Sequence, residues 1–173
     1  MDLFEAIKNR RSIRSFKKQD VPEDLVTKLL EAAQAAPTAG NSQPYQLVVA
    51  RNESVKQQLA KAAHNQKSMQ EAPVIIVVCA DEKASAKAYG DRGKKLYCLQ
   101  DTAIVTQNIL LAAYALGLGT CWVGAFDEDD AKKAVHTPKD VRPVAMIPVG
   151  YPNEAPKPTI RRPISEFVHK DSF

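Results

Sequence analysis

The stretch Pro73-Val74-Ile75-Ile76-Val77-Val78-Cys79 is a run of β-branched residues between a proline and a cysteine. An unbroken run of this kind is typical of a strand that is buried on both faces. The surrounding patterns predict further strands at residues 45–51, 120–123 and 141–149. They predict helices at residues 2–10, 22–37, 53–63, 96–116 and 127–135, the last capped by Asp127. This alternation indicates an α/β or α+β fold, with helices on both faces of a sheet.

The expected helix at residues 96–116 is apolar on nearly every side between Ala103 and Leu116. A helix with apolar side chains all round must be buried on all sides. In so short a chain, one face is expected to pack on the sheet and another on a partner subunit, which favours a homodimer. The alternative is a central helix that one chain encloses. Asp101 within this helix is expected to make a structural hydrogen bond.

The composition is that of an ordinary folded domain, with 45% apolar and 25% charged residues among 173. Nothing marks an internal boundary, so we expect one domain over residues 1–173. There is no apolar run long enough for a membrane span and no signal-peptide pattern at the start, so we expect a cytoplasmic protein. The cysteines and histidines lack metal-binding spacing, and no metal site is expected. The proline-rich tail from Tyr151 onward is expected to lie extended over another surface.

A basic segment follows the first expected helix: Arg10-Arg11-Ser12-Ile13-Arg14. Guanidinium groups bind phosphate through paired hydrogen bonds, and a serine hydroxyl adds another donor. A second cationic group, Lys157, Arg161 and Arg162, lies near the end of the chain. These groups indicate a phosphate site or a nucleic-acid surface, and a solvated basic face is the alternative.

Two further segments contain polar or glycine-rich residues. Amides in Pro37-Thr38-Ala39-Gly40-Asn41-Ser42-Gln43-Pro44 can donate and accept hydrogen bonds, which suits the polar edge of a flavin or a nucleobase. An ordinary turn is the alternative for this segment. The glycine-rich residues 117–124 follow a helix and open a strand, which is the reverse of a dinucleotide fingerprint. A Rossmann site is therefore not expected.

In this order and spacing, these segments resemble the nitroreductase family of FMN flavoproteins. The resemblance extends over nearly the whole chain, from Arg-Arg-Ser-Ile-Arg through Leu-Leu-Ala-Ala-Tyr-Ala-Leu-Gly-Leu-Gly to the late Arg-Arg-Pro. It implies an α/β (α+β) fold with a mixed sheet flanked by helices. It also implies an intertwined homodimer, in which the C-terminal tail wraps the other subunit and FMN lies at the interface.

The resemblance implies a phosphate group of residues and a ring group of residues. Arg10, Ser12 and Arg161 match the positions that hold the FMN phosphate, with Arg11 beside them and Arg162 as a weaker candidate. The ring group comes from four places: a cation by the pyrimidine edge, a segment of the partner subunit, a side chain that hydrogen-bonds the ring together with its neighbour, and a backbone pair near flavin N5. It consists of Arg14, Pro37, Thr38, Ala39, Asn41, Asn65, Gln66, Val123 and Gly124.

The activity that the resemblance implies is hydride transfer from NADH or NADPH through FMN to a small acceptor, such as a nitroaromatic or a quinone. The cofactor carries this chemistry, so no catalytic side chain is expected. The alternatives are a specialised member (a dehalogenase, an enone reductase or a flavin-fragmenting enzyme) and a basic nucleic-acid-binding module. An aromatic content of 6% without interleaved stacking residues counts against the last. The expected partners are a second copy of the chain and a small-molecule substrate, with no nucleic acid and no membrane.

Overall fold

A four-stranded sheet forms the centre of the computed structural model, which describes residues 2–173; Met1 of the expected domain over residues 1–173 lies outside the described residues. In the order β1-β2-β4-β3, the strands are β1 (Tyr45–Ala50), β2 (Val74–Asp81), β4 (Val141–Gly150) and β3 (Gly119–Thr120). Neighbouring strands pair antiparallel, and among residues 2–173 the only parallel pairing is an isolated bridge between Ser12 and Thr120. The expected α/β class is confirmed, but the expected mixed sheet is wrong for the four named strands, because they pair antiparallel and the parallel bridge involves Ser12 outside them.

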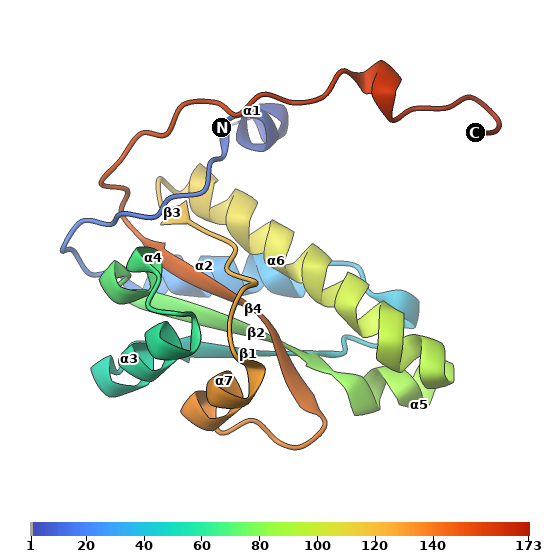
Figure 1. Ribbon diagram of the computed structural model, residues 1–173, viewed down its shortest axis with the longest axis horizontal. Helices are drawn as coiled ribbons and strands as arrows, with labels where there is room; N and C mark the ends of the chain where they lie inside the picture. Colours follow the sequence, from blue (N-terminus) through green and yellow to red (C-terminus); the bar gives the residue numbers. More distant parts are fainter. Residues whose placement is uncertain (1) are drawn as a thin grey trace.

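Helices cover both faces of the sheet, as Figure 1 shows. On one face lie α2 (Glu23–Gln34) and α6 (Cys98–Ala115), and on the other lie α3 (Glu53–Ala62), α4 (Lys67–Glu71) and α7 (Glu128–Val135). The remaining helical segments are α1 (Leu3–Asn9), α5 (Glu82–Arg92), the π-helical turn η2 (Gly93–Tyr97) and the short turns η1 (Ala39–Asn41) and η3 (Ile164–Glu166). The expected cap of α7 is confirmed, because the Asp127 carboxylate accepts the N–H of Asp130 at 2.8 Å.

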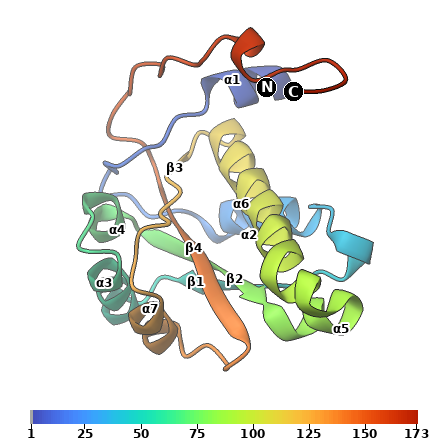
Figure 2. The same cartoon turned by 45° about the vertical axis from the view of Figure 1, so that its right-hand side comes forward.

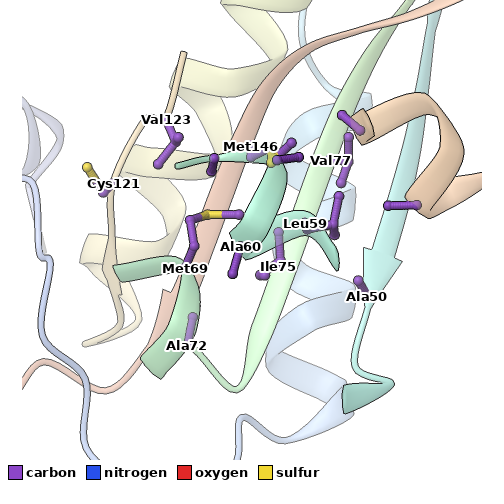
Figure 3. Close-up of a cluster of buried hydrophobic side chains, with 14 of the residues drawn as sticks. Ala50, Leu59, Ala60, Met69, Ala72, Ile75, Val77, Cys121, Val123 and Met146 are labelled. Atoms are coloured by element: carbon purple, nitrogen blue, oxygen red, sulfur yellow. The ribbon is translucent and has the colours of Figure 1, made fainter. Parts of the chain in front are cut away.

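Strand β2 is buried on both faces, as its sequence predicts. Alternate residues such as Ile76 pack against α2 and α6. The residues between them, such as Ile75, pack with Leu59 of α3 and Met69 of α4 on the opposite face (Figure 3). Because β1 and β4 flank β2, this strand is the part of the sheet around which the two cores form.

Helix α6 is buried along one side only within the described chain. Val105 and Ile109 are fully buried, whereas Ile104 keeps 39% of its surface exposed. Phe4 of α1 is also exposed, at 76%. The alternative in which one chain encloses this helix is therefore wrong, and a covering partner subunit stays a prediction. No helix within residues 2–173 is both long and apolar enough to cross a membrane.

Several segments differ from the sequence-based expectation. The expected strand at 120–123 is reduced to β3 and a single bridge between Val123 and Met146. Helices α4 and α5 and the turn η2 were not expected, because their sequences lack apolar periodicity. The tail after Pro152 passes along α1 without forming a core, and Ile160 is 99% exposed (Figure 1).

Candidate cofactor site

Three arginine side chains gather near the C-terminal end of α6. Burial lowers the pKa of the Arg10 guanidinium, and the positive charges of Arg11 and Arg161 lower that pKa further. Within residues 2–173, none of the three forms an ion pair with a carboxylate. The Nε atom of Arg11 is buried without a hydrogen-bond partner in the same part of the chain. Arg10 and Arg11 are half-buried and Arg161 is exposed, and uncompensated cations of this kind favour the binding of an anion such as a phosphate group.

The backbone of the arginine segment is fixed to β3. Ile13 donates its N–H to the carbonyl of Thr120 at 2.8 Å, and Ser12 forms the parallel bridge with the same residue. A Cβ atom at Gly119 would lie 2.9 Å from the side chain of Ile13, so only glycine allows this close approach. The backbone of the predicted phosphate segment is therefore fixed at Ser12 and Ile13.

Two carboxylates hold the remainder of this segment. Glu154 accepts the N–H groups of Arg14 and Ser15, the second at 3.2 Å. Glu71 accepts the N–H of Phe16 and the hydroxyl of Ser15, both at 3.0 Å, and the Phe16 hydrogen bond lowers the pKa of this carboxyl. Sequence reasoning missed both carboxylates, because they come from distant segments and no motif marks them.

The two backbone segments expected near the flavin ring lie side by side. Gln66 donates its amide Nε2 to the carbonyl of Ala125 at 3.1 Å, which ties the turn before α4 to the segment after Gly124. Val123 exchanges two backbone hydrogen bonds with Met146, each of 2.9 Å. Asn65 has a φ of 55°, a left-handed conformation that asparagine tolerates, and its side chain is exposed.

Cys121 and Trp122 connect the arginines to the Val123–Gly124 segment. Cys121 is buried and lies close to Arg10. Trp122 is 41% exposed, and a Cβ atom at Gly124 would lie 3.5 Å from its indole Nε1. The stretch from Cys121 to Gly124 therefore begins beside Arg10 and runs past the indole of Trp122 to the segment expected at the flavin ring.

The predicted residues Pro37, Thr38, Ala39 and Asn41 lie at the opposite end of α6. Ala39 donates its N–H to Asp101 Oδ1 at 3.1 Å, and this confirms the structural hydrogen bond expected for Asp101. A helix rises about 1.5 Å per residue, so the first turn of α6 and its C-terminal end are about 20 Å apart. Figure 2 shows β3 and the turn around residue 40 at these two separate ends. The described chain therefore does not bring this segment to the arginines.

Asp101 is buried, with 4% of its surface exposed. Burial raises the pKa of its carboxyl, and the hydrogen bond from Ala39 opposes part of that rise. The second carboxylate oxygen, Oδ2, is buried and has no partner within residues 2–173. Asp101 thus holds the turn through one carboxylate oxygen, while its other oxygen has no hydrogen-bond partner within residues 2–173.

A cavity of about 240 Å³ lies beside the arginines, lined in part by Arg10, Arg11, Tyr114 and Leu118. Sites for small organic ligands usually measure about 300–1,000 Å³. One chain therefore offers only part of a cavity for a cofactor of FMN size.

The fold and the candidate site define this chain as an α/β protein with a cluster of uncompensated arginines beside a fixed backbone segment. The family model described as Nitroreductase family matches residues 7–67 and 61–151, which together span most of the chain. The chain belongs to the nitroreductase family.

Individual relatives agree with this assignment. A Methanothermobacter thermautotrophicus protein whose name includes NADH dehydrogenase/NAD(P)H nitroreductase is 38% identical over 160 residues. The match covers 90% of this chain and 80% of the relative. A Bacillus subtilis protein named FMN reductase (NADPH) is 28% identical and is matched over 98% of this chain and 74% of its own length. The crystal structure of a nitroreductase family protein from Clostridium difficile 630 superposes with a TM-score of 0.89 at 32% identity, over 100% of both chains.

Proposed function

We propose that this protein is an FMN-dependent oxidoreductase that takes hydride from NADH or NADPH and reduces a small acceptor, such as a nitroaromatic or a quinone. The observation that carries the proposal is the convergence of Arg10, Arg11 and Arg161 beside Cys121, two residues before the fixed Val123. The names of two relatives, FMN reductase (NADPH) and NAD(P)H nitroreductase, support it.

The arginine cluster fits the phosphate of FMN. Arg10, Ser12 and Arg161 would hold that phosphate, with Arg11 adding charge beside them. Arg162 has a different contact, because its guanidinium lies 5.5 Å from the ring centroid of Phe167. We therefore give Arg162 the smaller part in phosphate binding.

The ring of FMN would lie along the two neighbouring backbone segments, at Asn65 and Gln66 on one side and Val123 and Gly124 on the other. When bound, FMN supplies the hydride chemistry, so the chain needs no acid or base of its own. The paired hydrogen bonds between Val123 and Met146 keep the ring-facing backbone in one position. Arg14 would add positive charge near the ring, which stabilises negative charge that develops there.

A homodimer would complete the site, with Pro37, Thr38, Ala39 and Asn41 reaching the FMN of the partner. The apolar side of α6 that includes Ile104 would then be covered. The tail would wrap the other subunit, which would bury side chains such as Ile160. We further propose that residues 1–173 act as one FMN-binding domain in the cytoplasm, where reduced nicotinamides are formed.

Absorption spectra of the purified protein test the proposal. We expect a yellow protein whose flavin band bleaches when NADH or NADPH is added without oxygen. Arg10→Ala should weaken FMN binding about 10- to 100-fold, the usual effect of losing a hydrogen bond to a charged group. Lys18→Ala is the control, because it removes a charge from the same basic stretch outside the cluster. A colourless protein that cannot be reconstituted with FMN would contradict the proposal.

A further inference from the structure

A break in α5 shapes a surface that the proposed cofactor site does not include. Tyr89 and Gly90 have non-helical backbone angles, and Gly90 has φ 55° and ψ −142°, which side-chain-bearing residues rarely adopt. Gly93 then packs directly on the carbonyl of Ser85, where a Cβ atom would overlap it. The backbone angles of Tyr89 and Gly90 and the close packing of Gly93 thus fix the direction of the chain where η2 begins.

The break brings Tyr89 against the turn at residues 37–41. A Cβ atom at Gly40 would overlap the hydroxyl of Tyr89, so the tyrosine lies directly on this turn. The same turn is held from the other side by Asp101. A ligand that contacts this turn would therefore also lie near the C-terminal end of α5.

Arg92 is held in place by the aromatic rings beside it. The rings of Tyr89 and Tyr97 meet edge to face, with centroids 5.2 Å apart. Arg92 donates Nε–H to the Tyr97 hydroxyl at 2.9 Å, and its guanidinium carbon lies 5.3 Å from the Tyr97 ring centroid. A single hydrogen bond at Nε leaves the outer guanidinium nitrogens available to another group.

The charge on Arg92 is not compensated, unlike the charges of its neighbours. Lys94 pairs with Glu82 at 3.4 Å, and Lys95 pairs with Asp91 at 2.8 Å. Arg92 has no carboxylate partner within residues 2–173. An oriented guanidinium with free donors recognises carboxylate and phosphate groups through paired hydrogen bonds.

We propose that Arg92 binds an anionic group, a carboxylate or a phosphate, on the small molecule that exchanges hydride beside the turn at residues 37–41. The inference rests on the proposed function, because that function places the turn at the flavin. Arg92 is the specificity-determining residue. Tyr97 is a positioning residue that acts through Arg92.

Matched pairs of substrates show whether the anionic group belongs to the electron acceptor or to the nicotinamide donor. For the acceptor, the measurement is kcat/KM for 4-nitrobenzoate relative to neutral 4-nitrobenzyl alcohol. For the donor, it is kcat/KM for NADPH relative to NADH, which lacks the extra phosphate. Arg92→Gln should lower one of these two ratios about tenfold, as expected for a lost charge-assisted hydrogen bond. The ratio that falls identifies which molecule carries the recognised group.

Three further variants test the specificity of the effect. Lys95→Gln removes the same charge from a neighbouring residue that already has a carboxylate partner, and it should leave both ratios unchanged. Arg92→Lys should restore part of the lost ratio. Tyr97→Phe should raise KM for the anionic substrate about threefold while kcat stays constant, because Arg92 keeps its charge and loses only the hydrogen bond that positions it.

The flavin content of each variant separates the possible failures. A protein that binds no FMN refutes the proposed function and this inference with it. A flavin-loaded Arg92→Gln enzyme in which both ratios and kcat/KM for NADH are unchanged refutes this inference alone, because NADH and NADPH share a pyrophosphate that the donor ratio does not report. An equal fall in Lys95→Gln also refutes it, because the effect would then be one of overall charge rather than of recognition.

Discussion

Three arginine side chains lie close together at the C-terminal end of α6, whereas at its N-terminal end the buried carboxylate of Asp101 holds the turn at residues 37–41. The first end holds Arg10, Arg11 and Arg161 without a carboxylate partner among residues 2–173, so like charges there repel until an anion arrives. The second end is fixed by the hydrogen bond from Ala39 to Asp101. The comparison shows that one end carries uncompensated positive charge, whereas the backbone at the other end is fixed by a hydrogen bond.

The largest effect, on FMN affinity, should come from removing arginine side chains at the C-terminal end of α6. Arg10→Ala combined with Arg161→Ala should weaken FMN binding about 10²- to 10⁴-fold, because two hydrogen-bonded charges are lost. Without FMN, the double variant should be no less stable than the parent, since like-charge repulsion is relieved. FMN titration and urea unfolding measure the two quantities.

Arg51→Ala is the matched control for that experiment. Arg51 pairs with Asp20 and Glu23, each at 3.0 Å, so its loss should reduce stability without changing FMN affinity. A double variant that is markedly less stable in the absence of FMN would contradict the contrast between the two kinds of arginine.

A smaller effect is the difference in stability lost when alanine replaces each of two glycines near the two ends of α6. Gly40 has φ 54° and Gly117 has φ 76°, so alanine at either position should cost about 1–2 kcal/mol of backbone strain. Gly40→Ala should cost more, because its new methyl group overlaps the Tyr89 hydroxyl, whereas Gly117 has open space around it. Thermal unfolding of both variants measures the difference, and equal losses would show that Tyr89 does not press on the turn.

The smallest effect concerns the pH dependence of the carboxylate end. Because the folded pKa of Asp101 is raised, the folded state holds this proton more tightly than the unfolded chain. This contribution to stability is complete below the unfolded pKa of about 3.9, and it is lost as pH rises through the folded value. The stability of Asp101→Asn relative to the parent should therefore increase with pH over that window.

Urea unfolding of both proteins from about pH 3.5 to about pH 7 measures this difference across the titration of Asp101. The lowered pKa values of Glu71 and Glu128 act in the opposite direction, but both proteins contain them and they cancel in the comparison. A difference that stays constant with pH would mean that Asp101 is not perturbed by burial.

The elements that sequence predicted best are those whose cause is local. The run from Val74 to Cys79 and the cap at Asp127 carry their own explanation in a few neighbouring residues. The break at Tyr89 and Gly90 could not be predicted in this way. Its backbone angles are set by contacts with Gly40 and by the close packing of Gly93, which belong to the folded chain.

The candidate site shows the same limit. The arginine motif and the late cationic group with Arg161 were both visible in the sequence, the resemblance assigned them to one phosphate, and the structure brings Arg161 close to Arg10. Glu71 and Glu154 hold the backbone of that motif, yet they lie 55 to 140 residues away along the chain. Only folding places such a carboxylate against a particular N–H, so no spacing rule could reveal either one.

Trp122 gives the site a built-in optical reporter. It is the single tryptophan of the chain, and its partly exposed indole lies beside Gly124. Indole emits light at wavelengths that flavins absorb, so a flavin along this segment would quench the emission by energy transfer. The fluorescence of the unmodified protein would therefore measure, in real time, how many molecules carry their cofactor.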